Sequence, residues 1–96
     1  MKFNKKFLIT VENLKAEELG VKAYRYKTCS VIDSREEYRG SMMHIVSLRT
    51  KDCRSNLSKE ELYGILDALG MRRDGTMKME ETFSGKTVHF MQPLAS

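Results

Sequence analysis

The pattern of apolar and polar residues is most regular between residues 57 and 71. The apolar residues there follow the i, i+3, i+4, i+7 spacing of one helix face: Leu62, Ile65, Leu66 and Leu69. The opposite face of such a helix carries charged residues and a glycine, which suits contact with solvent. This stretch therefore predicts an amphipathic helix whose apolar face packs on the rest of the protein.

Both ends of the predicted helix carry capping residues. Ser58 and Glu61, three residues apart, form the capping-box pattern, in which each side chain accepts a hydrogen bond from a backbone N–H near the helix start. Gly70 suits the left-handed conformation that follows the last turn of many helices. These signals place the helix over residues 58–70.

Elsewhere apolar and polar residues alternate, as they do in strands with one buried face. The alternating segments are residues 3–11, 41–50, 76–83 and 86–91. The last two segments are separated by Ser84 and Gly85, which are typical turn residues, so they predict a hairpin.

Two segments allow more than one interpretation. Asn13 and Gly20 can bound a short helix, but helical spacing also continues to about residue 27. Residues 21–32 are equally consistent with a strand, because aromatic and β-branched residues are frequent there. The polar residues 33–40 predict an exposed hairpin loop or flap.

These elements follow the order β-α-β-β-α-β-β. The sequence therefore predicts one α+β domain over residues 1–96, in which a small antiparallel sheet of four to five strands carries two helices on one face. The first six elements match the ferredoxin-like order. The alternative is a β-meander with only one substantial helix.

Composition narrows the class of protein. The 96 residues are 41% hydrophobic and 31% charged, as in a soluble globular domain. No segment approaches the ~18 consecutive apolar residues of a membrane span, and the apolar run after residues 1–6 is too short for a signal peptide. Cys29 and Cys53 are too few for a disulfide framework. We therefore expect a cytoplasmic protein with free thiols and no membrane partner.

The net charge of +4 is unevenly distributed. The two predicted helices, residues 13–20 and 58–70, carry two basic and five acidic residues, whereas the rest of the chain carries fifteen basic and eight acidic residues. A polyanion should therefore meet the sheet and loops and not the helices. The residues expected to contact a partner or nucleic acid are Arg25, Lys27, Arg49, Lys51, Arg54, Arg72 and Arg73.

One segment resembles the first-strand motif of RNA recognition motifs: Ile9-Thr10-Val11-Glu12-Asn13-Leu14. Arg39-Gly40, at the start of the next long strand, is similar to the beginning of that family's second motif. The family stacks bases on aromatic side chains, but Thr10, Ser41 and Met43 hold the corresponding positions here. The resemblance therefore indicates a strand followed by a helix, without the family's mode of binding RNA.

Candidate catalytic residues are few. His44 and His89 suit acid–base chemistry near neutral pH, but strand alternation places them on opposite faces of the sheet. A small metal-independent ribonuclease that uses one histidine with Arg49 or Tyr63 is one alternative. The cysteines and histidines lack the local spacing of metal ligands, so no metal or other cofactor is expected.

We therefore expect a non-enzymatic binding or regulatory protein that docks on a larger host or cellular partner. The basic sheet and loops favour a partner that handles nucleic acid. Small single domains often serve as accessory or inhibitor proteins of phages and mobile elements, and we expect a role of this type. Direct binding of RNA or single-stranded DNA is the next alternative. The edge strands of a small sheet also allow a homodimer.

Overall fold

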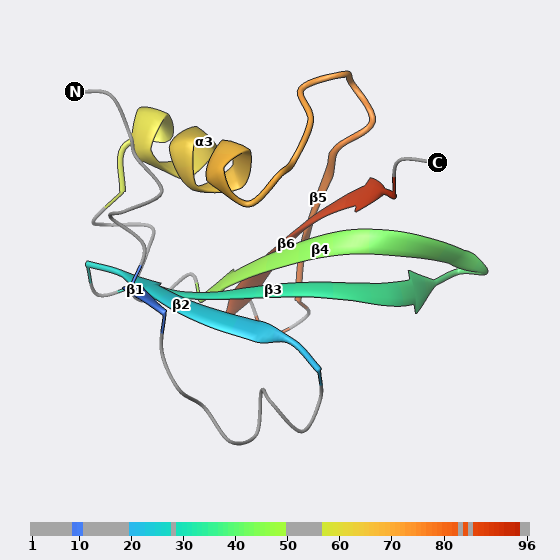
Figure 1. The fold of residues 1–96 in the computed structure, drawn as a ribbon, viewed down its shortest axis with the longest axis horizontal. Helices are drawn as coiled ribbons and strands as arrows, with labels where there is room; N and C mark the ends of the chain where they lie inside the picture. Colours follow the sequence, from blue (N-terminus) through green and yellow to red (C-terminus); the bar gives the residue numbers. More distant parts are fainter. Residues whose placement is uncertain are drawn as a thin grey trace.

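The computed structural model of the chain describes residues 9–10, 20–27, 29–49, 57–82, 84 and 86–94. These residues form one antiparallel sheet with the helix α3 packed over it, as Figure 1 shows. The strands are β1 (Ile9–Thr10), β2 (Lys22–Tyr26), β3 (Cys29–Tyr38), β4 (Ser41–Arg49), β5 (Lys78–Glu81) and β6 (Thr87–Pro93), and α3 spans Lys59–Ala68. The α+β class and the antiparallel sheet are therefore confirmed.

The strands follow the order β1-β2-β3-β4-β6-β5, and every neighbouring pair is antiparallel. Strands β1 to β4 form a meander, and β6 lies between β4 and β5. The ferredoxin-like order is not confirmed. The described residues contain one helix and are nearer to the β-meander alternative, but the meander stops at β4, since β6 and not β5 lies beside it. Of the second predicted helix, over residues 13–20, only Gly20 is described, and it lies in a turn with φ of 71°.

Within residues 21–32 the described residues form a hairpin and not a helix. β2 pairs with β3 up to Tyr26, which lies opposite Cys29. Lys27 begins the short connection with φ of 54°, a left-handed conformation that is uncommon for residues other than glycine. The two interpretations of this segment are thus decided in favour of strands, in line with its content of aromatic and β-branched residues.

The polar stretch 33–40 was expected to be a loop, and this prediction is wrong. β3 continues through it to Tyr38, and the β3–β4 hairpin closes at Arg39 and Gly40, which have φ of 52° and 84°. Two successive residues with positive φ form the tight turn whose twist matches that of paired strands. Residues 35–37 are polar because they are exposed on both faces of the strand, whereas the buried Asp33 and Ser34 are hydrogen-bonded to His44 and to Ile45 O. The polar run therefore does not mark a break in the strand.

The core lies between α3 and one face of the sheet. Its buried residues are Tyr26, Cys29, Val31, Val46, Leu48, Ile65, Leu66, Leu69, Met71, Val88 and Phe90. We call the face that carries Val31, Val46 and Phe90 the helix-side face, and the opposite face, which carries Ala23 and Ile45, the far face. Among the described residues, no helix is long and apolar enough to cross a membrane.

α3 has both of the capping motifs that the sequence predicts. Ser58 Oγ accepts a hydrogen bond from Glu61 N at 3.1 Å, and Glu61 Oε1 accepts one from Ser58 N at 3.2 Å. At the other end, Gly70 has φ of 92° and Met71 N donates to Leu66 O at 2.9 Å. This arrangement closes the last turn of the helix and directs the chain back toward the sheet.

Glu61 also attaches the start of α3 to the β2–β3 hairpin. Its Oε2 atom accepts a hydrogen bond from the Tyr26 hydroxyl and lies 2.8 Å from Lys27 Nζ. The hydrogen bonds from Lys27, Tyr26 and the Ser58 backbone lower the pKa of Glu61 to about 2. The hydrogen bond to Glu61, together with burial of the ring, raises the pKa of Tyr26 to about 12.

Glu61→Gln is expected to weaken the dependence of stability on acid pH. Because the pKa of Glu61 is lowered from 4.5 to about 2 on folding, its ionised carboxylate stabilises the fold above about pH 4.5. That contribution is lost as the pH falls toward 2. The variant should therefore have a lower Tm than the wild type at neutral pH and a smaller loss of Tm on acidification, measured by circular dichroism.

Glu60→Gln is the matched control, because Glu60 is exposed in the same helical turn. It removes one negative charge without removing the contacts of Glu61 with the hairpin. A Glu61→Gln variant with the acid dependence of the wild type would contradict the role given to Glu61.

Candidate nucleic-acid interface

The structure describes five of the seven residues expected to contact a partner: Arg25, Lys27, Arg49, Arg72 and Arg73. The other two, Lys51 and Arg54, lie outside the described residues. The five described cations divide into two groups. Three of them are paired with carboxylates of this chain, and two are exposed on the far face of the sheet.

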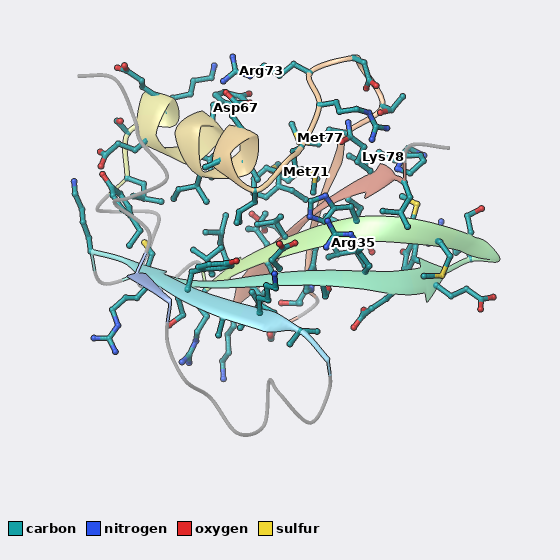
Figure 2. All side chains as sticks on the ribbon, viewed as in Figure 1. Arg35, Asp67, Met71, Arg73, Met77 and Lys78 are labelled. Atoms are coloured by element: carbon teal, nitrogen blue, oxygen red, sulfur yellow. The ribbon has the colours of Figure 1, made fainter. Side chains whose placement is uncertain are left out.

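Arg73 and Lys27 are paired with acidic residues of α3. Arg73 donates two hydrogen bonds to the carboxylate of Asp67, at 2.8 and 3.1 Å, and Figure 2 shows the two side chains together. The Arg73 guanidinium also lies 4.8 Å from the centre of the Tyr63 ring. Lys27 pairs with Glu61. Both cations offset the acidic charge of the helix, so they add little to the positive field that a partner would meet.

Arg72 belongs to a hydrogen-bond network that holds the segment between α3 and β5. The fully buried side chain of Gln92 accepts from Arg72 N at 2.8 Å and donates to Arg72 O at 2.6 Å and to Thr76 Oγ1 at 3.0 Å. The Arg72 guanidinium donates to Asp74 Oδ2 at 3.1 Å and to Pro93 O at 2.8 Å. Arg72 therefore has a structural role, since its backbone and side chain join this segment to Gln92 and Pro93.

The two histidines lie on opposite faces of the sheet, as predicted. His44 is buried on the helix-side face, with its Nε2 atom 2.5 Å from Asp33 Oδ1. His89 lies on the far face, where its Nδ1 atom is 2.7 Å from Ser47 Oγ. The two rings therefore have no common site in which one acts as acid and the other as base. The described residues contain no group of three histidine, cysteine or acidic side chains placed to hold a metal ion.

Arg25 and Arg49 lie on the far face, at the end of the sheet where β4 finishes and β6 begins. Arg25 is opposite Ser30, and Arg49 is opposite Thr87. The β3–β4 register pairs Val31 with Leu48, and its continuation by one residue brings Ser30 beside Arg49. Four side chains thus form a line across β2, β3, β4 and β6. We call these four residues, Arg25, Ser30, Arg49 and Thr87, the basic row.

The basic row carries two positive charges that no described carboxylate neutralises. Arg25 and Arg49 are exposed, and neither makes an ion pair with the described residues. One strand separates them, so their backbones are about 10 Å apart. The exposed Ser30 hydroxyl lies between them. Guanidinium groups match phosphate geometry, and hydroxyl groups add hydrogen-bond donors, so the row suits a phosphate-bearing ligand.

A second polar pair adjoins the basic row on the far face. Ser47 lies two residues before Arg49, and His89 lies two residues after Thr87, so strand alternation keeps both on the face of the row. The two side chains are half-buried and hydrogen-bonded to each other. Ser47 and His89 thus form a second polar pair across β4 and β6, next to the pair of Arg49 and Thr87 in the basic row.

Comparison with protein-family models, with curated proteins and with solved structures finds no match for this chain. Of the two segments that resemble RNA recognition motifs, the structure describes Ile9 and Thr10, which form β1, and Arg39 and Gly40, which directly precede β4. β2 and β3 separate these two strands, so β1 and β4 do not lie side by side. The function is therefore inferred from the surface of this chain alone.

Sequence reasoning selected Arg25 and Arg49 by charge but missed Ser30 and Thr87. Serine and threonine are common on strands, and only the register shows which of them lie beside an arginine. A hairpin that closes between Tyr26 and Cys29 would have identified Ser30, because this register places Ser30 opposite Arg25.

Proposed function

We propose that this protein is a binding protein that contacts the phosphate backbone of a single-stranded nucleic acid through the basic row. The observation that carries the proposal is the line of two exposed arginines, which no described carboxylate neutralises, with hydroxyl residues beside them across four adjacent strands. Arginine and hydroxyl side chains are frequent donors to phosphate oxygens in nucleic-acid complexes. One line of such donors suits one backbone, which favours a single strand over a duplex.

The composition of the basic row favours a polyanion over a protein as its ligand. The row has no apolar side chain, whereas the centre of a stable protein interface is apolar and closely packed. It also has no aromatic side chain on which a base could stack. Binding should therefore depend on salt concentration and vary little with base sequence.

Arg25→Gln and Arg49→Gln are each expected to weaken binding to labelled single-stranded RNA and DNA about fivefold, at about 1 kcal/mol for each lost contact. Each variant should also reduce the slope of log affinity against log salt concentration by about 0.7, the value for one phosphate contact with a single strand. Fluorescence anisotropy at several salt concentrations gives both quantities. The losses should be similar for oligonucleotides of different sequence, because the contacts are to the backbone.

Arg35→Gln is the control that removes the same charge from elsewhere on the sheet. Arg35 is exposed on β3 but lies on the helix-side face, and Figure 2 shows it on the side of the sheet where α3 lies. The affinity of the Arg35→Gln variant for the oligonucleotides, and the dependence of that affinity on salt, should match those of the wild type. If Arg35→Gln weakens binding as much as the two row variants do, the contact is not made by the basic row.

Docking on a protein is the second candidate function, and an exposed apolar pair favours it. Met42 is 51% exposed and Leu94 is 36% exposed, and Leu94 N donates to Met42 O at 3.3 Å, so the two are neighbours across β4 and β6. This pair lies at the opposite end of the sheet from the basic row. It is small beside the area that a stable interface buries, so we rank it below the basic row.

A further inference from the structure

We infer that two copies of this chain associate through β5, the edge strand of the sheet. β5 pairs with β6 and is the last strand in the order, and all four of its residues are exposed. An exposed edge strand presents backbone N–H and C=O groups that a second strand can bind. This inference uses a different surface from the basic row and does not depend on the proposed function.

The hydrogen bonds of the β5–β6 hairpin show which backbone groups of β5 point outward. Thr82 N donates to Thr87 O at 2.9 Å, so these two residues form a hydrogen-bonded pair. Successive residues of an antiparallel strand direct their N–H and C=O groups to alternate sides. Lys78 and Glu80 therefore face β6, and Met79 directs its backbone groups away from β6, where a second copy can pair with them.

The side chains of β5 favour one register for this pairing. When two antiparallel copies continue one sheet, residues opposite each other must lie on the same face of the sheet. Because faces alternate along a strand, this requires the twofold axis to pass through a residue and not between two residues. With the axis at Met79, the two Met79 residues exchange both backbone hydrogen bonds, and Lys78 lies opposite Glu80 of the second copy on each side of the axis. An axis at Lys78 or at Glu80 would place like charges opposite each other, which is destabilising.

The side chains needed for this register are accessible. Lys78 is exposed and makes no ion pair with the described residues. Glu80 is exposed, and its Oε2 atom accepts a hydrogen bond from the Tyr38 hydroxyl at 3.0 Å, which leaves Oε1 for the lysine. Met79 is 65% exposed, and on the helix-side face the two Met79 side chains meet at the axis. The dimer thus has two ion pairs flanking a thioether contact.

The same charges make the pairing selective. Charged residues on an edge strand discourage pairing with an unrelated strand. In the register centred on Met79, however, Lys78 of each copy faces Glu80 of the other, so a second copy of this chain is favoured. Four residues from each copy form a small interface. We therefore expect an equilibrium between monomer and dimer that depends on concentration, and not a permanent dimer.

Sedimentation velocity on the full chain, from micromolar to millimolar concentration, tests this inference. The wild type should shift from monomer to dimer over this range. Lys78→Glu and Glu80→Lys each place like charges opposite, so each variant alone should stay monomeric. An equimolar mixture of the two variants should dimerise again, as should the double variant with both substitutions, because each combination restores the opposite charges.

Lys86→Glu is the control, because Lys86 is exposed but lies before β6 and off the β5 edge. It should dimerise as the wild type does. A wild type that stays monomeric at millimolar concentration would overturn the inference, and so would single variants that dimerise normally or a mixture that fails to associate. Circular dichroism of each variant verifies that it is folded, and oligonucleotide binding is a separate measurement that reports on the basic row.

Discussion

Asp33→Ala is expected to lower the free energy of unfolding by about 1–3 kcal/mol, the usual cost of leaving one group of a buried hydrogen-bonded pair without its partner. The two side chains of this pair are buried, with Asp33 8% exposed and His44 4% exposed. Asp33 Oδ1 lies 2.5 Å from His44 Nε2. Without the carboxylate, the ring nitrogen is left without its partner in a place where water does not replace it. Urea denaturation of the variant gives the change in the free energy of unfolding.

Two further variants separate the loss of the Asp33–His44 pair from a general effect of substitution. Glu37→Ala removes an exposed carboxylate from the same face of β3 and should change stability by no more than about 0.5 kcal/mol. Combining Asp33→Leu with His44→Leu should recover most of the stability lost in Asp33→Ala, because no buried polar atom is left unpaired. A single Asp33→Ala variant as stable as the wild type would show that the pair is not a structural requirement.

Leu66→Ala is expected to lower the free energy of unfolding by about 2–5 kcal/mol, through lost burial and the cavity that remains. Leu66 is 1% exposed and belongs to the core between α3 and the helix-side face. The buried residues of α3 are few, so the loss of one large side chain weakens the attachment of the whole helix. Urea denaturation measures this loss also.

Leu62→Ala is the matched control for Leu66→Ala. Leu62 lies on the same apolar stripe one turn earlier, but it is only partly buried. Its replacement should cost clearly less than that of Leu66, because less apolar surface returns to water. Equal losses at the two positions would contradict the packing of α3 described above.

The helix was predictable because its signals are local. The capping box of Ser58 and Glu61 and the left-handed Gly70 act within a few residues, so the sequence alone places both ends of α3. The placement of His44 and His89 on opposite faces was also predictable, because alternation in a strand needs only the parity of each position.

The order of the strands was not predictable, because it depends on pairing between segments that are distant in sequence. The polar residues 33–40 predict an exposed loop or flap, but a run of polar residues also occurs in strands that are exposed on both faces, such as the end of β3. The tight turn at Arg39 and Gly40 distinguishes the loop from the strand. It closes the hairpin between Tyr38 and Ser41, so the residues before it stay paired as part of β3.

The candidate interface was predictable only in part, for a related reason. Charge counts identify basic residues, but they do not show which of them are neutralised within the fold. Lys27 and Glu61 are far apart in sequence and meet only because α3 packs beside the β2–β3 hairpin. For the same reason, charge counts do not distinguish Arg73, which is paired with Asp67, from Arg49, which is exposed and has no ion pair with the described residues.

The most direct test of the proposed function is the salt dependence of binding between the wild-type protein and a generic single-stranded oligonucleotide. Measurable binding is expected at low salt, with little preference for base sequence. The log of the affinity should fall linearly with the log of the salt concentration, with a slope of about −1.4 or steeper, since Arg25 and Arg49 each contribute about −0.7. No binding at low salt, or binding that does not respond to salt, would contradict the assignment of the basic row as a nucleic-acid interface.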